Sequence, residues 1–307
     1  MKIVYLALVL ALFTACGSRA TKPQIEPIEV VLVEGGFIAH PLSNFYGTQM
    51  FMQSFYIGKF EVTQAQWQEV MGENPSFHQG EGLNPDVMPV ESISWYDAII
   101  FLNKRSEMEG FEPVYIIDKT KLDPNNLTLE TADFPESEFL VDNYRWSVTT
   151  NPAANGYRLP TELEWEYAAG GGQLTQGFEF SGSNDISEVA WFFRTSGDEY
   201  LDGLWHSGTL EANNGRTHPV GQKKSNELGI YDMSGNVREW VWEWNGNWFV
   251  EQDRIIVPES GDARVVRGGS WVSGEDATRF NFRGSGIPPH LYYEDLGLRV
   301  VRNGPVE

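Results

Sequence analysis

Residues 226–240 read NELGIYDMSGNVREW, and residues 267–271 read RGGSW. In both stretches a glycine lies within a few residues of a tryptophan. Glycine adopts backbone conformations that other residues avoid, and tryptophan is a very large ring for a core to cover. The pattern therefore predicts tight backbone turns beneath large rings. The 31 glycines and 16 prolines of the chain also indicate a fold rich in turns and loops.

Three arginines are expected to be buried in such a fold, and a buried guanidinium needs a carboxylate or carbonyl partner. These arginines are Arg158, Arg267 and Arg299. The candidate partners are Glu162, Glu164 and Glu239. A loop-rich fold must satisfy many backbone groups without regular structure. We therefore interpret most of these residues as determinants of the fold.

Local signals predict a few short helices and strands. A capping box predicts a helix from Thr63 to about Met71, an N-cap serine and a glycine stop predict one from Ser94 to Gly110, and a second capping box and a glycine stop predict one from Thr161 to Gly170. Apolar runs at 30–38 and 55–62 predict strands. Residues 118–155 are polar and irregular, which predicts an insertion in the domain. The fold class is therefore predicted to be α+β, with few short helices, a mixed twisted sheet and much loop.

The composition allows a sizeable core and argues against one class of partner. Hydrophobic residues make up 41% of the chain, and the formal net charge is -21. A surface this acidic repels phosphate backbones, so we expect no nucleic-acid partner.

The N-terminus predicts export and a lipid anchor. Residues 1–15 combine Lys2 with an apolar stretch too short to span a bilayer, as in a signal peptide. Cys16 is the single cysteine of the chain, and small residues precede it, as at a lipidation site. We expect lipidation at Cys16, a tether over 16–29 and a domain over 30–307. The alternative is an ordinary secretory signal in which the cysteine is incidental. No later run of 18 apolar residues predicts a membrane span.

Several segments together resemble the formylglycine-generating enzyme (sulfatase-modifying factor) family, which has a variant of the C-type-lectin-like fold. The segments are 60–64, 89–95, 156–162, 218–221, 226–240, 267–271 and 296–302. Their number, order and spacing carry the resemblance, which covers roughly residues 30 to 302. It implies one loop-rich domain of that fold over 30–307, with the insertion at about 118–155.

The resemblance also implies a catalytic pair that this chain lacks. Enzymes of the family use two cysteines that bind copper and handle a substrate thiol. The matching positions here are Ser273 and Thr278. A hydroxyl does not bind Cu(I) as a thiolate does, and it forms no mixed disulfide. We therefore expect neither copper nor the family's oxidase activity.

One calcium site is implied by the resemblance. Its ligands would be the side chains of Asp232 and Glu239 and the carbonyls of Gly235 and Val237. Calcium prefers six to eight oxygen ligands, and this loop offers several. The alternative is that Asp232 caps a turn and Glu239 pairs with an arginine. Arg238 stands where the family commonly has an aromatic residue, which puts the neighbouring surface in doubt.

The preferred functional prediction is a non-catalytic binding or scaffold lipoprotein of the cell envelope. It would present residues 271–295 to a protein or glycan, on the outer membrane at its periplasmic or surface face. The rings expected to be exposed there are Trp271, Phe280, Tyr292 and Tyr293. Lipoproteins of secretion or gliding and diversified receptors of this family are similar. The alternatives are a divergent formylglycine-generating oxidase acting on a sulfatase cysteine, another metal-dependent oxidase, and a structural lipoprotein without a discrete ligand.

Overall fold

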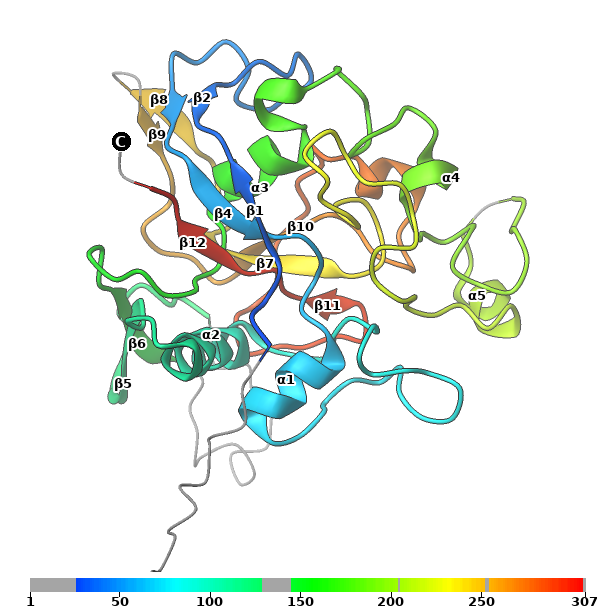
Figure 1. Ribbon diagram of the computed structural model, residues 1–307, viewed down its shortest axis with the longest axis horizontal. Coiled ribbons are helices and arrows are strands. Elements are labelled where there is room, and N and C mark those ends of the chain that lie inside the picture. The colour runs from blue at the N-terminus through cyan, green and yellow to red at the C-terminus, as the bar shows by residue number, and fades with distance from the viewer. Residues whose placement is uncertain (1–25, 129–144, 204, 252–253, 306–307) are drawn as a thin grey trace, which may run out of the picture.

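The computed structural model describes residues 26–128, 145–203, 205–251 and 254–305. It is an α+β fold in which short helices and small sheets are joined by long loops (Figure 1), which confirms the predicted fold class. The α-helices are α1 (Gln64–Met71), α2 (Trp95–Glu109), α3 (Glu162–Ala169), α4 (Ile186–Val189) and α5 (Ser207–Ala212), and the 3-10 helices are η1 (Gly172–Leu174) and η2 (Glu275–Thr278). The signal peptide, Cys16 and residues 16–25 of the tether lie outside the described residues and stay predictions.

Two three-stranded sheets form the centre of the fold. In the first, β4 (Phe55–Gly58) lies between β1 (Val30–Val33) and β12 (Val301–Asn303) and is antiparallel to both. In the second, β7 (Arg238–Trp244) lies between β10 (Arg264–Arg267), which is antiparallel, and β11 (Leu296–Gly297), which is parallel. Each sheet is completed by a strand from the C-terminal part of the chain. The segment that leads into β11 is thereby placed beside the start of β7.

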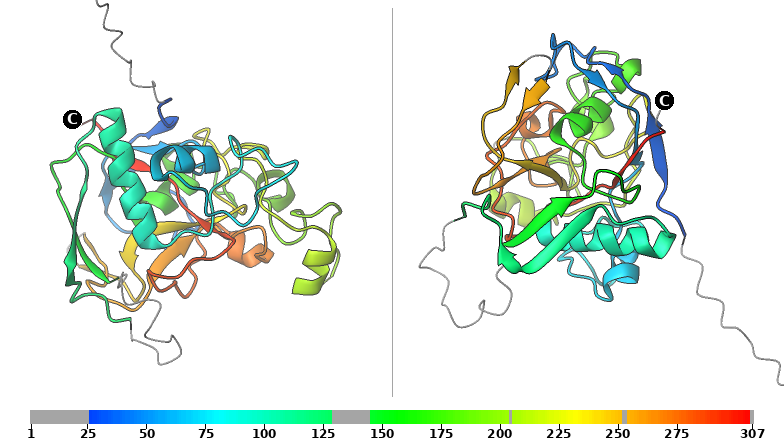
Figure 2. Two further views of the ribbon diagram at one scale, coloured as in Figure 1. Left: turned by 90° about the horizontal axis from the view of Figure 1, so that it is seen from below. Right: turned by 90° about the vertical axis from the view of Figure 1, so that its left-hand side faces the viewer.

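The helices begin as the sequence predicts. Thr63, Ser94 and Thr161 each form a capping box at the start of α1, α2 and α3. The apolar face of α2 is buried, as its helical spacing indicates. Figure 2 shows α1 and α2 together on one side of the molecule and α5 on a loop at its far edge.

Residues 118–155 are more regular than predicted. β5 (Tyr115–Leu122) and β6 (Trp146–Thr150) form an antiparallel pair that frames this segment. Half-buried strands with polar residues on one face do not stand out from loop by composition. The other two-stranded sheets are β2 (Gly36–Phe37) with β3 (Phe51–Met52) and β8 (Phe249–Glu251) with β9 (Arg254–Ile256).

The predicted tight turns are present at two glycines, one of them against a large ring and the other against the backbone of a tryptophan. Gly268 has φ 94°, and a Cβ there would lie 3.2 Å from the buried ring of Trp165. Gly235 has φ 85°, and a Cβ there would lie 2.3 Å from the carbonyl oxygen of Trp191. Both positions therefore combine a left-handed backbone with a close approach that excludes a side chain.

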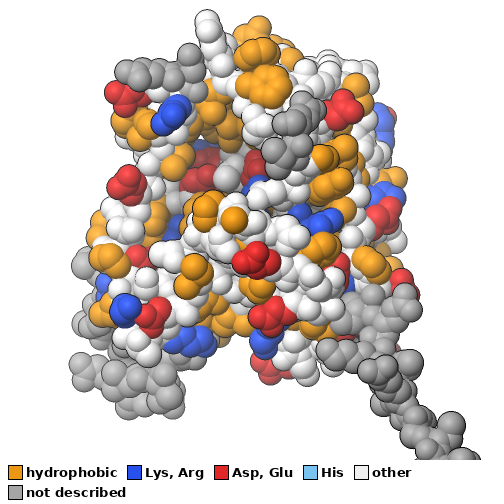
Figure 3. All heavy atoms as spheres, turned by 60° about the vertical axis from the view of Figure 1, so that its left-hand side comes forward, with side chains coloured by type: hydrophobic (Ala, Val, Ile, Leu, Met, Phe, Trp, Pro, Cys, Tyr) orange, Lys and Arg blue, Asp and Glu red, His pale blue; other side chains and the backbone are white. Residues whose placement is uncertain are grey.

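Each of the three arginines contacts one of the candidate carboxylates. Arg158 binds Glu164 at 2.6 Å, Arg299 binds Glu239 at 2.8 Å, and Arg267 contacts Glu162 at 3.4 Å. Arg267 also binds a further carboxylate, that of Glu166, at 2.6 Å. Acidic and basic side chains are likewise visible in a hollow on the face shown in Figure 3. These pairs tie α3, β7, β10 and the segment before β12 together through charges that cannot be left unpartnered.

Candidate functional site

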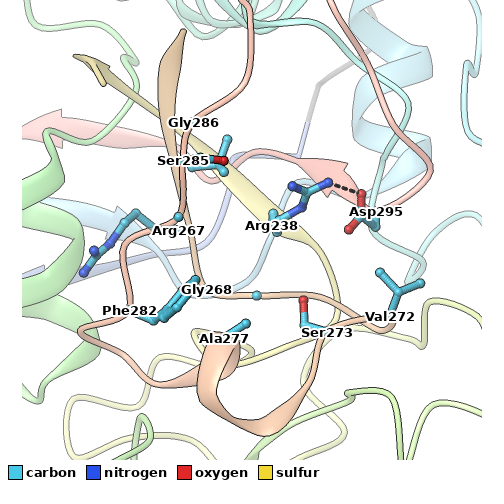
Figure 4. A pocket seen from close by; sticks show the side chains of 13 residues that line it. Arg238, Arg267, Gly268, Val272, Ser273, Ala277, Phe282, Ser285, Gly286 and Asp295 are labelled. Atoms are coloured by element: carbon cyan, nitrogen blue, oxygen red, sulfur yellow. Dashed lines mark hydrogen bonds and ion pairs between the residues drawn. The ribbon is translucent and has the colours of Figure 1, made fainter. Parts of the chain in front are cut away.

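A first hollow of about 430 Å³ opens where β7, β10 and η2 meet (Figure 4). Arg238 enters it from the start of β7, and Asp295 enters it from the residue before β11. The glycine turn after β10 and a second glycine-containing loop supply bare backbone to its wall. The lining residues include Gly268, Gly269, Ser273, Phe282, Gly284 and Ser285. A hollow of this size with a few placed polar groups is typical of a ligand site.

A second hollow of about 480 Å³, here called the aromatic hollow, adjoins the first. It shares three lining residues with the first: Arg238, Val272 and Asp295. Its other lining residues are Phe77, Ser92, Tyr292, Tyr293 and Glu294. The rings of Phe77 and Tyr292 are each 66% exposed, and Tyr293 is 44% exposed. Exposed rings around a concavity are suited to bind an apolar or planar group.

An ion pair divides the two hollows. A guanidinium nitrogen of Arg238 lies 2.5 Å from Oδ1 of Asp295, as the dashed line in Figure 4 marks. Ser270 Oγ donates a hydrogen bond of 2.7 Å to Oδ2 of the same carboxylate. The backbone N–H of Arg238 also donates to the carbonyl of Asp295 at 2.8 Å. Asp295 is buried, and the charge-assisted pair lines both hollows.

The two positions that the resemblance equates with cysteines differ in their surroundings. Ser273 lines the first hollow, where its Oγ accepts a hydrogen bond of 2.9 Å from the backbone N–H of Ser270. Thr278 is completely buried, and its Oγ1 donates to the carbonyl of Glu275 at 2.7 Å. One of the two hydroxyls therefore faces the hollow, and the other closes the turn of η2.

Two of the four predicted ligand-binding rings are not exposed. Trp271 is 6% exposed and Phe280 is completely buried. Trp271 packs beneath the aromatic hollow, where its Nε1 donates to the carbonyl of Glu294 at 3.1 Å. Phe280 packs against His40, with ring centroids 4.2 Å apart. The expectation of exposure was wrong for both: Trp271 follows the glycine turn at Gly268 and Gly269 and is covered by the segments around it, and Phe280 belongs to a buried hydrophobic cluster of the core. Tyr292 and Tyr293 are exposed as expected.

The predicted calcium ligands lie in a buried cluster of carboxylates that surrounds the guanidinium of Arg299. Glu239 accepts two hydrogen bonds on Oε1 from Arg299, at 2.8 and 3.0 Å. Its Oε2 accepts a 2.7 Å bond from the indole N–H of Trp165. Burial raises the pKa of Asp232 to about 6 and raises that of the neighbouring Glu61 well above its ordinary value. Three buried carboxylates thus surround one guanidinium.

Asp232 suits a calcium ligand, whereas Glu239 is engaged with an arginine. Asp232 Oδ1 is buried and lacks a hydrogen-bond partner within the described part of the chain, which fits a cation ligand. Glu239 instead takes the arginine pairing that was the alternative interpretation. No group of three or more His, Cys, Asp or Glu side chains among residues 26–305, apart from the undescribed gaps, is placed to hold a metal ion. The ligand set of Asp232, Gly235, Val237 and Glu239 stays a prediction.

Several residues of the site were not predicted from the sequence. Arg238 stands where the family commonly has an aromatic residue. This difference was the sequence signal that could have pointed to the ion pair with Asp295. Phe77 and Ser92 carry no local signal, because they come from a loop and from the approach to α2. Their roles follow from tertiary packing against residues 292–295, about 200 positions away in the sequence.

Comparisons with known proteins agree with this architecture. A family model described as "Sulfatase-modifying factor enzyme 1-like domain" matches residues 17–304. The chain is 45% identical over 281 residues to "Chaperone protein LppX" of Paenibacillus barcinonensis, covering 90% of this chain and 89% of that protein. It is 33% identical over 125 residues to a formylglycine-generating enzyme of Streptomyces coelicolor, covering 38% and 37% of the two chains.

A solved structure has a similar fold. Treponema denticola variable protein 1 superposes with a TM-score of 0.68 and 33% identity, covering 90% of this chain and 95% of that chain. The chain therefore belongs to the family of proteins with a sulfatase-modifying factor enzyme 1-like domain.

Proposed function

We propose that this chain is a lipid-anchored protein of the cell envelope that binds an extended segment of a partner polypeptide in its two adjoining hollows. The observation that carries the proposal is the pair of hollows on either side of Arg238 and Asp295. Two adjacent concavities that share a polar partition can take successive side chains of one extended chain.

The chemistry of the rim favours a polypeptide ligand. Exposed aromatic rings anchor protein partners, because they supply large contact area at low cost in conformational entropy. Phe77, Tyr292 and Phe282 are such rings, and Phe282 is 42% exposed at the first hollow. Ser273 and the glycine turns add polar groups that can pair with a peptide backbone. The name of the relative from Paenibacillus barcinonensis, a chaperone protein, supports a partner of the same class.

A divergent formylglycine-generating oxidase is the second candidate. The local similarity to the enzyme of Streptomyces coelicolor favours it. Ser273 and Thr278 argue against it, because neither hydroxyl supplies the soft ligand that Cu(I) prefers. The deep burial of Thr278 also separates it from any substrate in the first hollow.

The anchor is proposed from Cys16. No helix within the described residues is long and apolar enough to cross a membrane. A lipid on Cys16 would hold the domain to the membrane, with residues up to 29 as the tether. Attachment to the outer membrane, on its periplasmic or surface face, belongs to this proposal.

The experiment selects ligands from a random peptide library on the full chain, purified in detergent. The affinity of the selected peptides is then measured by calorimetry for wild type, Phe282→Ala and Tyr292→Ala. Each hollow variant is expected to weaken binding by about tenfold, since a buried aromatic anchor contributes about 1–2 kcal/mol or more. Phe51→Ala is the matched control, because Phe51 is 55% exposed on β3 and lines neither hollow.

The outcome separates the candidates. If the peptides bind wild type and both hollow variants with equal affinity, the two hollows are not the peptide-binding site. A second arm incubates the full chain and copper with a peptide containing the sulfatase sequence Cys-x-Pro-x-Arg and analyses it by mass spectrometry. Conversion of its cysteine to formylglycine would replace the binding proposal by the oxidase.

A further inference from the structure

The aromatic hollow contains one carboxylate that has no partner of its own. Glu294 lines the hollow, where it follows Tyr293 in the chain, and it is exposed. Its carbonyl accepts the indole N–H of Trp271, but within the described part of the chain its carboxylate makes no hydrogen bond and no ion pair. Two further carboxylates, those of Asp295 and Glu211, lie close enough to act on its charge. A positively charged group would be stabilised at this place.

Two arginines in this part of the molecule are already paired with other carboxylates. Arg238 lies 2.5 Å from Asp295, as Figure 4 shows. Arg216, which is near enough to the Phe77 loop to act on the charge of His78, pairs with Asp198 at 3.2 Å. Neither guanidinium is therefore left to neutralise the exposed carboxylate of the hollow. The formal net charge of the chain is -21, so the surrounding field has the same negative sign.

Three exposed rings supply the surfaces that a cation prefers. Phe77, Tyr292 and Tyr293 all line the hollow and are all exposed. The face of an aromatic ring attracts a cation that lies within about 6 Å of the ring centre. Tyr293 already makes such a contact within the protein, because the guanidinium of Arg238 lies 5.7 Å from its ring centroid. The rings and the carboxylate of the hollow thus favour the same kind of ligand.

The classes of side chain that a partner could place in this hollow differ in how they meet Glu294. An acidic side chain would face it with like charge. An apolar side chain could cover the rings, but it would remove water from the carboxylate without replacing the lost hydrogen bonds, which costs free energy. A lysine or arginine covers the rings with its alkyl stem and offers the carboxylate a charge-assisted hydrogen bond. Only the basic side chain satisfies both features of the hollow.

We propose that the aromatic hollow receives a lysine or arginine side chain of the partner polypeptide. The rings of Phe77, Tyr292 and Tyr293 surround the cation, and Glu294 is its counter-charge. This inference rests on the proposed function, because it names the class of side chain that one of the two hollows accepts.

The first experiment tests the hollow without a peptide. N-acetyl-lysine amide is titrated against the full chain in detergent, with its tyrosine rings labelled with carbon-13, and the ring signals are followed by NMR. Tyr292→Phe and Tyr293→Phe identify the two signals. N-acetyl-norleucine amide is the matched probe, because it has a similar alkyl chain without the ammonium group. In wild type both signals should shift, with an affinity for the lysine probe about tenfold higher than for the norleucine probe.

A charge variant separates the carboxylate from the rings. Glu294→Gln should weaken binding of the lysine probe by about threefold or more and leave binding of the norleucine probe unchanged. Glu107→Gln, at an exposed position on α2, removes the same charge away from the hollow and should bind both probes as wild type does. Equal affinity of wild type for the two probes would overturn the inference. So would the absence of shifts with the lysine probe, or unchanged binding of that probe to Glu294→Gln.

The peptides selected on the full chain provide the second experiment. Each lysine or arginine of a selected peptide is replaced in turn by norleucine. One of these replacements should weaken binding to wild type by about tenfold and have a clearly smaller effect on binding to Glu294→Gln, because the two changes remove the same interaction. Peptides that bind in the hollows without a basic residue would overturn the inference and leave the proposed function standing. A lysine probe that binds as expected, with no peptide selected, would reject the polypeptide partner and leave the cation site standing.

Discussion

The imidazole of His78 stands edge-on to the indole of Trp271, with ring centroids 4.7 Å apart and the ring planes at 87°. The same indole donates its N–H to the carbonyl of Glu294, and its backbone carbonyl accepts a 2.8 Å bond from Ser196 Oγ. Trp271 thus packs against the loop of Phe77 and holds the segment of residues 292–294 by a hydrogen bond. The tryptophan expected to contact a ligand instead supports the residues that can do so.

Replacing Trp271 by alanine should therefore act on stability. Loss of a buried aromatic ring costs about 3–5 kcal/mol, from lost burial and from the cavity left behind. Tyr292→Ala, which removes a ring that is 66% exposed, should change the free energy of unfolding by no more than about 0.5 kcal/mol. Urea denaturation of both variants measures the difference. Equal and small effects would mean that Trp271 does not support the site.

The stability of the domain should depend on pH through Glu243. Burial raises the pKa of Glu243 to about 8 from its ordinary value of 4.5. Between these values the folded state binds a proton that the unfolded state has released, so stability falls as the pH rises through this window. Glu243→Gln removes the titrating group and can still accept the 2.8 Å bond from the backbone of Glu162. The difference in melting temperature, Glu243→Gln minus wild type, should therefore increase from about pH 5 to about pH 8.

Thermal scans across that range test the pH prediction, with Glu107→Gln on the exposed face of α2 as the control. The control should differ from wild type by the same amount at every pH. A difference for Glu243→Gln that is likewise independent of pH would show that Glu243 does not titrate in this window.

Calcium should stabilise the domain if Asp232 is a ligand. A cation that binds only the folded state raises the melting temperature, and a chelator removes that gain. The chelator should lower the melting temperature of wild type and leave that of Asp232→Ala unchanged. Asp86→Ala, at an exposed position, should respond as wild type does. An equal response in wild type and Asp232→Ala would reject the assignment and leave Glu239 as the partner of Arg299.

Cys16→Ser tests the anchor. Without the thiol no diacylglycerol can be attached, so the chain should move from the membrane fraction to the soluble fraction. Fractionation followed by immunodetection measures the shift. Unchanged partition into membranes would mean that Cys16 is incidental to attachment.

Features that depend on neighbouring residues were predicted well. The helix caps at Thr63, Ser94 and Thr161 are interactions between positions three residues apart, so the sequence contains all of their partners. The left-handed turns at Gly235 and Gly268 follow from the absence of a Cβ. The strands β5 and β6, which frame residues 118–155, were not predicted. Each is stabilised by pairing with the other, which is distant in the sequence.

The sequence alone determined the family fold, the need of its arginines for carboxylates and the replacement of two expected thiols by Ser273 and Thr278. These are matters of residue type and order, which a sequence states directly. Only the tertiary structure decided that Trp271 and Phe280 are buried, that Arg238 meets Asp295 where two hollows adjoin, and that the buried Glu91 accepts a hydrogen bond from the backbone of His78 beside Phe77. Those facts depend on contacts between segments up to about 200 residues apart, and side-chain burial and ionisation follow from such contacts rather than from local sequence.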